Sequence, residues 1–177
     1  MSSKKTQNKN QGQVPANENT ADKVFPFVLV FVTLIVLSGL VTTFFLNIDD
    51  DLYFTNNPFI RSLSFENIRA IFTQPYGGNY HPLTTLIEAV EYNFFKLNAS
   101  SYHFVSLIAH TINIVLVYIL AGKFLNDIKF KAIIATIFAL HPMHVESVAW
   151  ITDKTDLYCT FFFLLGMLSY LKYIHSE

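Results

Sequence analysis

The fold of this chain is decided around the stretch His141-Pro142-Met143-His144-Val145-Glu146, which separates two apolar segments. One apolar run, at residues 133–140, leads into this stretch, and a second one, at residues 157–171, follows it. Ionisable side chains beside hydrophobic segments of membrane length are costly, so they usually face a cavity or a functional path. The stretch therefore indicates a membrane protein that contains a polar site.

The composition of the chain also indicates a membrane protein. Apolar residues make up 52% of the 177 residues and charged residues only 14%, whereas soluble domains average about 25% charged residues. A formal net charge of −1 offers no basic surface for nucleic acid, so we expect no nucleic-acid partner. The single cysteine, Cys159, excludes a disulfide within the chain.

Four segments are long and apolar enough to be predicted as transmembrane helices. The uncharged first segment has 23 residues, and at about 1.5 Å per residue it reaches roughly 34 Å, more than the roughly 30 Å of a bilayer core. The second carries His110 and Asn113, which suggests that one of its faces is turned toward other helices. The third contains the His-Pro-x-His-x-Glu motif. The sequence thus predicts an all-α membrane protein with spans at residues 24–46, 103–125, 130–150 and 155–174.

The polar residues between these spans predict how the chain is oriented. Residues 1–23 are almost free of apolar side chains, which predicts a disordered tail. With four spans, eight lysines fall on one side of the membrane, and the positive-inside rule makes that side cytoplasmic. We therefore expect an integral membrane protein with both termini in the cytoplasm. The eight lysines are Lys4, Lys5, Lys9, Lys23, Lys123, Lys129, Lys131 and Lys172.

The long outer loop, residues 47–102, is predicted to contain short helices. Ser64 is suited to cap a helix at residues 65–72. Pro82 suits the first position of a second helix, in which apolar residues recur at helical spacing and Glu88 lies on a different face. An amphipathic helix between two spans is expected to lie on the membrane surface.

Asp49-Asp50-Asp51 follows the first span and is the first candidate for chemistry. One interpretation is a general base or a metal ligand at the outer surface. The alternative is a solvated acidic end of a helix. The sequence leaves the need for a metal open; if one is required, adjacent carboxylates favour Mg²⁺ or Mn²⁺ over zinc.

The motif at residues 141–146 is the second candidate. Pro142 is expected to bend or end the preceding helix. Because residues 133–140 cover only about 12 Å at helical rise, the motif is predicted at membrane depth, where non-helical backbone must be buried in protein or line water. Alternatives are polar groups that brace helix packing and a metal-handling protein, although the His-Glu-x-x-His spacing of zinc proteases is missing. Asp153 and Asp156, three residues apart, have two interpretations, an extended acidic outer rim or an exposed loop, and Lys154 between them favours the loop.

Three stretches of the sequence occur in an order that resembles a known family. The family is that of membrane proteins with tetratricopeptide repeats behind a GT-C glycosyltransferase-like domain, whose animal members are the transmembrane and tetratricopeptide repeat O-mannosyltransferases. The resemblance covers residues 24–174 and rests on Asp49-Asp50-Asp51-Leu52-Tyr53 with Asn56-Asn57-Pro58, on Asn79-Tyr80-His81-Pro82-Leu83-Thr84, and on residues 138–150.

The resemblance implies the front part of a GT-C fold and a glycosyltransferase of the bacterial inner membrane or the endoplasmic reticulum. Such enzymes pass a sugar, mannose in the animal relatives, from a polyprenyl-phosphate carrier to a protein hydroxyl at the outer or lumenal face. It implies Asp50 as general base together with Asp49, and Glu146 as a further catalytic residue. It also implies binding roles for Asp51, His81, His141 and His144.

One departure from the family limits this expectation. Enzymes of the GT-C superfamily have more spans than the four for which this chain has room, and the tetratricopeptide repeats do not occur in it. We therefore expect an amino-terminal fragment that is inactive alone. The alternative is a non-catalytic membrane anchor or assembly module.

Overall fold

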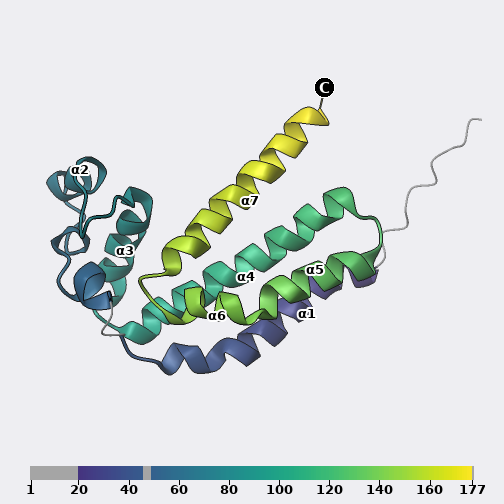
Figure 1. Ribbon diagram of the computed structural model, residues 1–177, viewed down its shortest axis with the longest axis horizontal. Coiled ribbons are helices and arrows are strands. Elements are labelled where there is room, and N and C mark those ends of the chain that lie inside the picture. The colour runs from purple at the N-terminus through teal and green to yellow at the C-terminus, as the bar shows by residue number, and fades with distance from the viewer. Residues whose placement is uncertain (1–19, 46–48, 177) are drawn as a thin grey trace, which may run out of the picture.

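A computed structural model describes residues 20–45 and 49–176 of the chain, and these residues form a helical bundle with a small helical region at one end (Figure 1). The predicted all-α fold is confirmed: the described residues contain no strand, only an isolated bridge between Tyr76 and Asn79. The bundle helices are α1 (Thr20–Leu37), which continues as the 3₁₀ helix Ser38–Thr42, α4 (Ala99–Phe124), α5 (Ile128–Leu140), α6 (Pro142–Ala149) and α7 (Lys154–Ile174).

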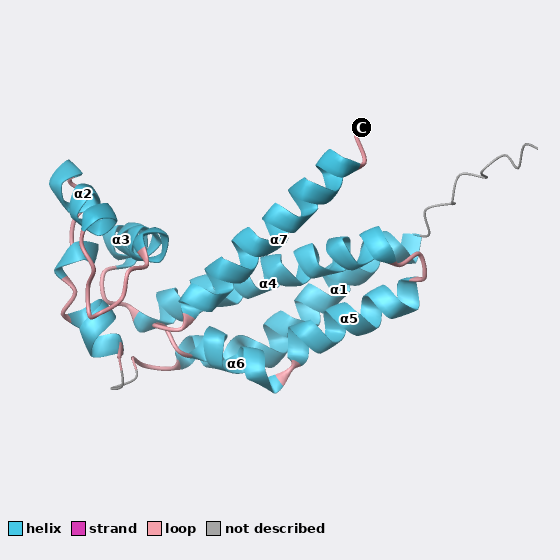
Figure 2. Cartoon of the chain, turned by 45° about the horizontal axis from the view of Figure 1, so that its top comes forward, coloured by secondary structure: helices cyan, strands magenta, loops and turns pink. Residues whose placement is uncertain are grey.

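Helix α4 is the centre of the bundle. Helices α1 and α5 pack along it, and α7 packs against it before diverging toward the C-terminal end (Figures 1 and 2). One apolar cluster joins Leu29 of α1 and Ile114 of α4 to Ala135 and Ala139 of α5. A second cluster includes Leu107 of α4 and Leu157 of α7.

Three helices are long and apolar enough to cross a membrane: Thr20–Thr42, Ala99–Phe124 and Lys154–Ile174. The bent pair α5 and α6 supplies a fourth span if it is counted as one. Phe27, Phe31 and Phe163 are exposed on these helices, 72%, 63% and 65% respectively. Large apolar side chains that face outward along whole helices suit lipid rather than water. The protein is therefore an all-α membrane protein, as the sequence predicts.

The predicted third span is broken at Pro142, as expected from the sequence. Helix α5 ends at Leu140 because Pro142 disfavours helical backbone at His141, which is extended (φ −66°, ψ 132°). Pro142 then begins α6, and the two helices meet at 48°. His141 caps α6, its Nδ1 accepting a hydrogen bond from the Met143 amide at 3.2 Å. At about 1.5 Å per residue, the 13 residues of α5 cover only roughly 20 Å.

Helix α1 begins at Thr20, so residues 20–23 belong to a helix rather than to the predicted tail. Residues 1–19 of that tail, and the predicted end of the first span at residue 46, lie outside the described residues. Pro26 has no amide hydrogen to donate to the carbonyl of Asp22, four residues earlier. The Tyr118 hydroxyl of α4 lies 3.2 Å from that carbonyl and compensates for the missing bond.

Residues 49–98 form the region at the end of the bundle, here called the cap. Its helical elements are the π-helical turn Asp51–Thr55, the 3₁₀ helix Pro58–Ile60, α2 (Phe65–Thr73) and α3 (Pro82–Phe95). As predicted, Ser64 caps α2, its hydroxyl accepting from the Asn67 amide at 3.3 Å, and Pro82 begins α3.

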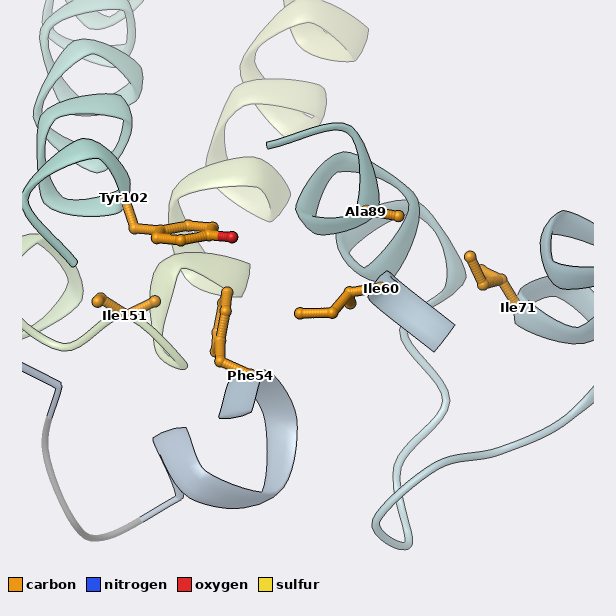
Figure 3. Packing of buried hydrophobic residues seen from close by; sticks show 6 residues of the cluster. All are labelled: Phe54, Ile60, Ile71, Ala89, Tyr102 and Ile151. Carbon is orange, nitrogen blue, oxygen red and sulfur yellow. The ribbon is translucent and has the colours of Figure 1, made fainter. Parts of the chain in front are cut away.

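The cap has its own apolar core, which also reaches the bundle. Phe54 and Ile60 from the cap meet Tyr102 of α4 and Ile151 from the α6–α7 connection (Figure 3). The Phe54 and Tyr102 rings pack edge to face with centroids 5.2 Å apart. Contacts of this kind fix the position of the cap on the bundle, because aromatic side chains bury a large apolar area.

Helix α3 turns its polar face toward the protein. Thr84, Glu88 and Glu91 are buried, whereas the apolar Leu83 and Phe94 are exposed. In a helix surrounded by water the opposite arrangement is usual. The exposed apolar face fits the prediction that this helix lies on a membrane surface.

Candidate active site between the cap and the bundle

A cavity of about 270 Å³ lies between the cap and the α6–α7 connection, and we call it the cap cavity. Its volume is near the lower end of the roughly 300–1,000 Å³ of small-molecule sites. Carboxylates, amides and aromatic rings line it together. The lining includes Asp49, Tyr53, Asn57, Tyr76, Asn79, His81, Glu88, Trp150, Thr152, Asp153 and Asp156.

The three adjacent aspartates point to different surroundings. Asp49 lines the cap cavity. Asp50 is fully buried, and its Oδ1 accepts hydrogen bonds from the Thr152 amide (3.1 Å) and hydroxyl (2.6 Å). Asp51 is exposed, and its Oδ1 accepts from the Thr55 hydroxyl at 3.2 Å. The carboxylate that reaches the cavity is therefore Asp49, whereas Asp50 ties the cap to the α6–α7 connection.

This arrangement does not fit a divalent cation held by the aspartate cluster, because Asp50 and Asp51 are each engaged elsewhere. Across residues 20–45 and 49–176, no three side chains of His, Cys, Asp or Glu are grouped so that they could hold a metal ion. A hard cation such as Mg²⁺ needs several oxygen ligands at one point.

The candidate residues of the two other stretches are also separated in space. His81 lines the cap cavity, as Asp49 does. His141 is exposed at the start of α6, and His144 lines a different cavity within the bundle. Glu146 is exposed on α6 and does not line the cap cavity. Its charge nevertheless acts on Asp153: burial raises the pKa of the Asp153 carboxyl, and the charges of Asp156 and Glu146 add to the rise.

The sequence analysis did not single out Glu88 as a site residue, although it lines the cap cavity from α3. Burial raises the pKa of Glu88 to about 8, the charge of Lys154 opposes the rise, and the charges of Glu91 and Asp50 add to it. Glu88 is therefore largely protonated at neutral pH and can donate a hydrogen bond. The recurrence of Thr84, Glu88 and Glu91 at helical spacing was the signal that they share one face.

The prediction of an exposed loop around Lys154 was wrong. Lys154 begins α7 and is fully buried, and its Nζ pairs with Glu91 Oε2 at 2.5 Å. The Tyr158 hydroxyl donates to the other oxygen of Glu91 at 2.8 Å. Lys154 Nζ also lies over the rings of Phe54 and Tyr102, 5.0 and 4.7 Å from the centroids. This group, the Glu91–Lys154–Tyr158 cluster, joins α3 to α7 behind the cavity.

The cap cavity thus combines a carboxylate base with groups that can hold a polar ligand. Asp49, Asp153 and Asp156 supply negative charge, and Glu88 supplies a donor at neutral pH. Tyr53, Tyr76 and Asn79 are already joined by hydrogen bonds and ring contacts: Asn79 Nδ2 donates to the Tyr53 hydroxyl at 2.6 Å, and the two tyrosine rings meet edge to face. Such an arrangement can orient a hydroxyl nucleophile and accept its proton.

Comparison with known proteins identifies a group of relatives. The chain is 32% identical over 94 residues to protein O-mannosyl-transferase TMTC3 of Homo sapiens, a match that covers 53% of this chain and 10% of TMTC3. It is 31% identical over 140 residues to protein O-mannosyl-transferase F38B6.6 of Caenorhabditis elegans, covering 70% of this chain and 20% of that protein. It is 34% identical over 99 residues to protein O-mannosyl-transferase TMTC2 of Mus musculus, covering 56% of this chain and 12% of TMTC2.

The chain thus spans about a tenth to a fifth of the length of these curated relatives. No family model and no solved structure matches it. The relatives nevertheless agree with one another in name, and they agree with the resemblance drawn from the three sequence stretches. The chain is therefore a homologue of the TMTC protein O-mannosyl-transferases.

Proposed function

We propose that the chain is part of a GT-C-type membrane glycosyltransferase that moves mannose from a polyprenyl-phosphate carrier to a protein hydroxyl in the cap cavity. The observation that supports this most directly is Asp49, a carboxylate that lines a cavity of ligand size together with Glu88 and His81. The names of the relatives, protein O-mannosyl-transferases, support the sugar and the acceptor.

In this proposal Asp49 is the general base. Its carboxylate takes the proton of the acceptor hydroxyl while that oxygen attacks the anomeric carbon of the sugar, and the bond from this carbon to the phosphate oxygen breaks. Asp153 and Asp156 stabilise the positive charge that develops on the sugar ring. Asp50, which the resemblance favoured as base, becomes a positioning residue because its Oδ1 is held by Thr152. Glu88, protonated at neutral pH, donates to a sugar or acceptor oxygen.

The remaining candidate residues are assigned to the surroundings of this centre. His81 lines the same cavity as Asp49 and binds the sugar or the acceptor. Glu146 acts through its charge on Asp153 rather than by contact with the cavity. We assign His141, His144 and Asp51 no role in the chemical step.

The orientation that suits this function places the cap outside the cytoplasm, at the outer or lumenal face. Lys23, Lys123 and Lys131 line a single depression at the end of the bundle away from the cap. Lysine-rich ends of spans usually lie in the cytoplasm. This supports an integral protein of the endoplasmic reticulum or the bacterial inner membrane whose cap cavity opens on the opposite side.

Transfer by the full-length protein tests the proposal. The assay follows labelled mannose from its polyprenyl-phosphate carrier to an acceptor protein in membrane vesicles. Asp49→Asn should lower the rate by about 10²–10⁴-fold, since it removes a general base. The matched control is Asp51→Asn, an exposed neighbour that does not line the cavity, which should leave the rate close to wild type. Equal rates in wild type and a well-expressed Asp49→Asn variant would rule out Asp49 as the base.

A further inference from the structure

A second cavity, of about 290 Å³ and open on one side, lies between α4, α6 and α7, and we call it the span cavity. His110 and Asn113 of α4 line it, together with His144 of α6 and Cys159 of α7. His110, Asn113 and Cys159 belong to helices that are long and apolar enough to cross the membrane, and His144 belongs to the bent pair α5 and α6, which passes only as a pair. A polar cavity in such a position needs a physical explanation, because unpaired polar groups are costly there.

His110 presents a hydrogen-bond acceptor to this region. Its Nε2 lies 3.1 Å from the carbonyl oxygen of Ala139, which can only accept, so Nε2 carries the hydrogen. In the neutral ring Nδ1 is then a bare acceptor. The His110 side chain is fully buried, and within the part of the chain that the structure describes Nδ1 has no partner.

Asn113, three residues further along α4, presents a second acceptor. Its Nδ2 donates to the carbonyl oxygen of Leu157 at 2.9 Å, which fixes the orientation of the amide. Its Oδ1 is buried and has no partner among the described residues. Leaving a buried acceptor unpaired costs about 1–3 kcal/mol. Two acceptors on one face of one helix therefore require a ligand that donates hydrogen bonds.

Asp156 lines both the span cavity and the cap cavity. Asp156 is exposed at the first turn of α7 and adds a third acceptor at the entrance. His110 Nδ1, Asn113 Oδ1 and the Asp156 carboxylate all accept hydrogen bonds. No group of three His, Cys, Asp or Glu side chains suited to a metal ion occurs at residues 20–45 or 49–176. The ligand that fits is a small neutral donor that can pass Asp156.

We propose that the span cavity is filled with water that enters from the cap cavity past Asp156 and is held by His110 Nδ1 and Asn113 Oδ1. Buried waters typically make about three hydrogen bonds to otherwise unpaired polar groups, and one water needs only about 30 Å³. The span cavity of about 290 Å³ therefore has room for several. Water at this depth lets polar groups of a membrane span remain polar without a protein partner.

Cys159, the only cysteine of the chain, is exposed on α7 where it lines the open side of the span cavity, and it serves as the reporter. A charged, membrane-impermeant methanethiosulfonate reacts with thiolates in water and much more slowly with thiols in lipid. The reagent is added to vesicles that contain the full-length protein, and modification of the Cys159 peptide is followed by mass spectrometry. The reference is the double substitution Cys159→Ser and Phe163→Cys, which moves the thiol one turn along α7 to an exposed position outside the cavity.

We expect the reagent to modify wild-type Cys159 at least about tenfold faster than the reference thiol. His110→Leu and Asn113→Leu should each slow the modification of Cys159 by about tenfold, which corresponds to roughly 1.4 kcal/mol for one lost hydrogen bond to water. His110→Gln keeps a polar side chain and should restore most of the wild-type rate.

Two results would overturn the proposal. One is modification of Cys159 no faster than of the reference thiol, a comparison that needs no change at His110 or Asn113. The other is a wild-type modification rate in folded His110→Leu and Asn113→Leu variants. Neither result bears on Asp49 in the cap cavity, so the span-cavity proposal and the proposed transferase activity can fail separately.

Discussion

The same three kinds of side chain meet at the two ends of the bundle, in very different surroundings. At the cap end, Glu91 binds Lys154 and Tyr158; at the other end, Asp22 binds Lys131 and Tyr118. In both groups a lysine pairs with a carboxylate that also accepts from a tyrosine hydroxyl. The side chains of Lys154 and Glu91 are 0% and 5% exposed, whereas those of Lys131 and Asp22 are 8% and 37% exposed.

The comparison shows that the energetic role of an ion pair depends on its solvation rather than on its geometry. The distances are similar, 2.5 Å for Lys154 to Glu91 and 2.6 Å for Lys131 to Asp22. If one partner is removed, the carboxylate of Asp22 can still be solvated, but that of Glu91 cannot. The cap-end cluster therefore stabilises the α3–α7 contact that shapes the cap cavity, whereas the other pair is a weaker tie between α1 and α5.

Lys154→Met is expected to have the largest effect on stability. It leaves the Glu91 carboxylate buried without its counter-ion, which should cost about 3–5 kcal/mol of unfolding free energy. Denaturant unfolding in detergent micelles measures the loss. The double variant Lys154→Met and Glu91→Gln removes both charges and should recover a large part of it. A single variant as stable as wild type would contradict the role assigned to the Glu91–Lys154–Tyr158 cluster.

Glu88→Gln tests the second carboxylate near Lys154. Burial raises the pKa of Glu88 from 4.5 to about 8. The stability linked to this raised pKa is fully present below pH 4.5 and is lost as pH rises through about 8, because the unfolded chain releases its proton first. Between pH 5 and pH 9 wild type should lose roughly 4 kcal/mol of unfolding free energy, and Glu88→Gln should lose less. Unfolding measured at pH 5, 7 and 9 checks this, and parallel curves for both proteins would contradict it.

Lys131→Met should have the smallest effect and is the matched control for Lys154→Met. Its partner Asp22 is partly exposed and still accepts from the Tyr118 hydroxyl, so the loss should be about 1 kcal/mol or less. The same unfolding measurement applies. A loss equal to that of Lys154→Met would mean that the two ends of the bundle do not differ as their burial indicates.

Much of the fold follows from local signals in the sequence. The apolar runs predicted α1, α4 and α7, and Pro142 predicted the break between α5 and α6. Ser64 and Pro82 marked the starts of two cap helices. These features depend on residues within one or two turns of one another, so periodicity, capping and the missing amide of proline are sufficient to find them.

The candidate site was predicted less completely. The sequence pointed to the aspartate cluster and to His81, but it could not tell which of the three aspartates faces a cavity. That depends on Thr152, which lies about a hundred residues away in the chain and holds Asp50. The sequence predicted an exposed loop at Lys154, because charged side chains near the end of a span are usually solvated. In the structure Lys154 is buried, and its ammonium group pairs with the Glu91 carboxylate.

The sequence by itself determined that this is an all-α membrane protein, where its helices start and break, and which family it resembles. Hydrophobic length and local backbone preferences are properties of contiguous residues, and the motif stretches are read directly from the chain. Only the tertiary structure decided which polar groups come together: Asp49 and Glu88 line the same cavity, Lys154 pairs with Glu91 behind it, and Asp156 lines both cavities. These pairings follow from helix packing, because packing decides which side chains are buried and lose their water. Residues of the same type, such as two aspartates or two lysines, therefore have different roles at different places in the fold.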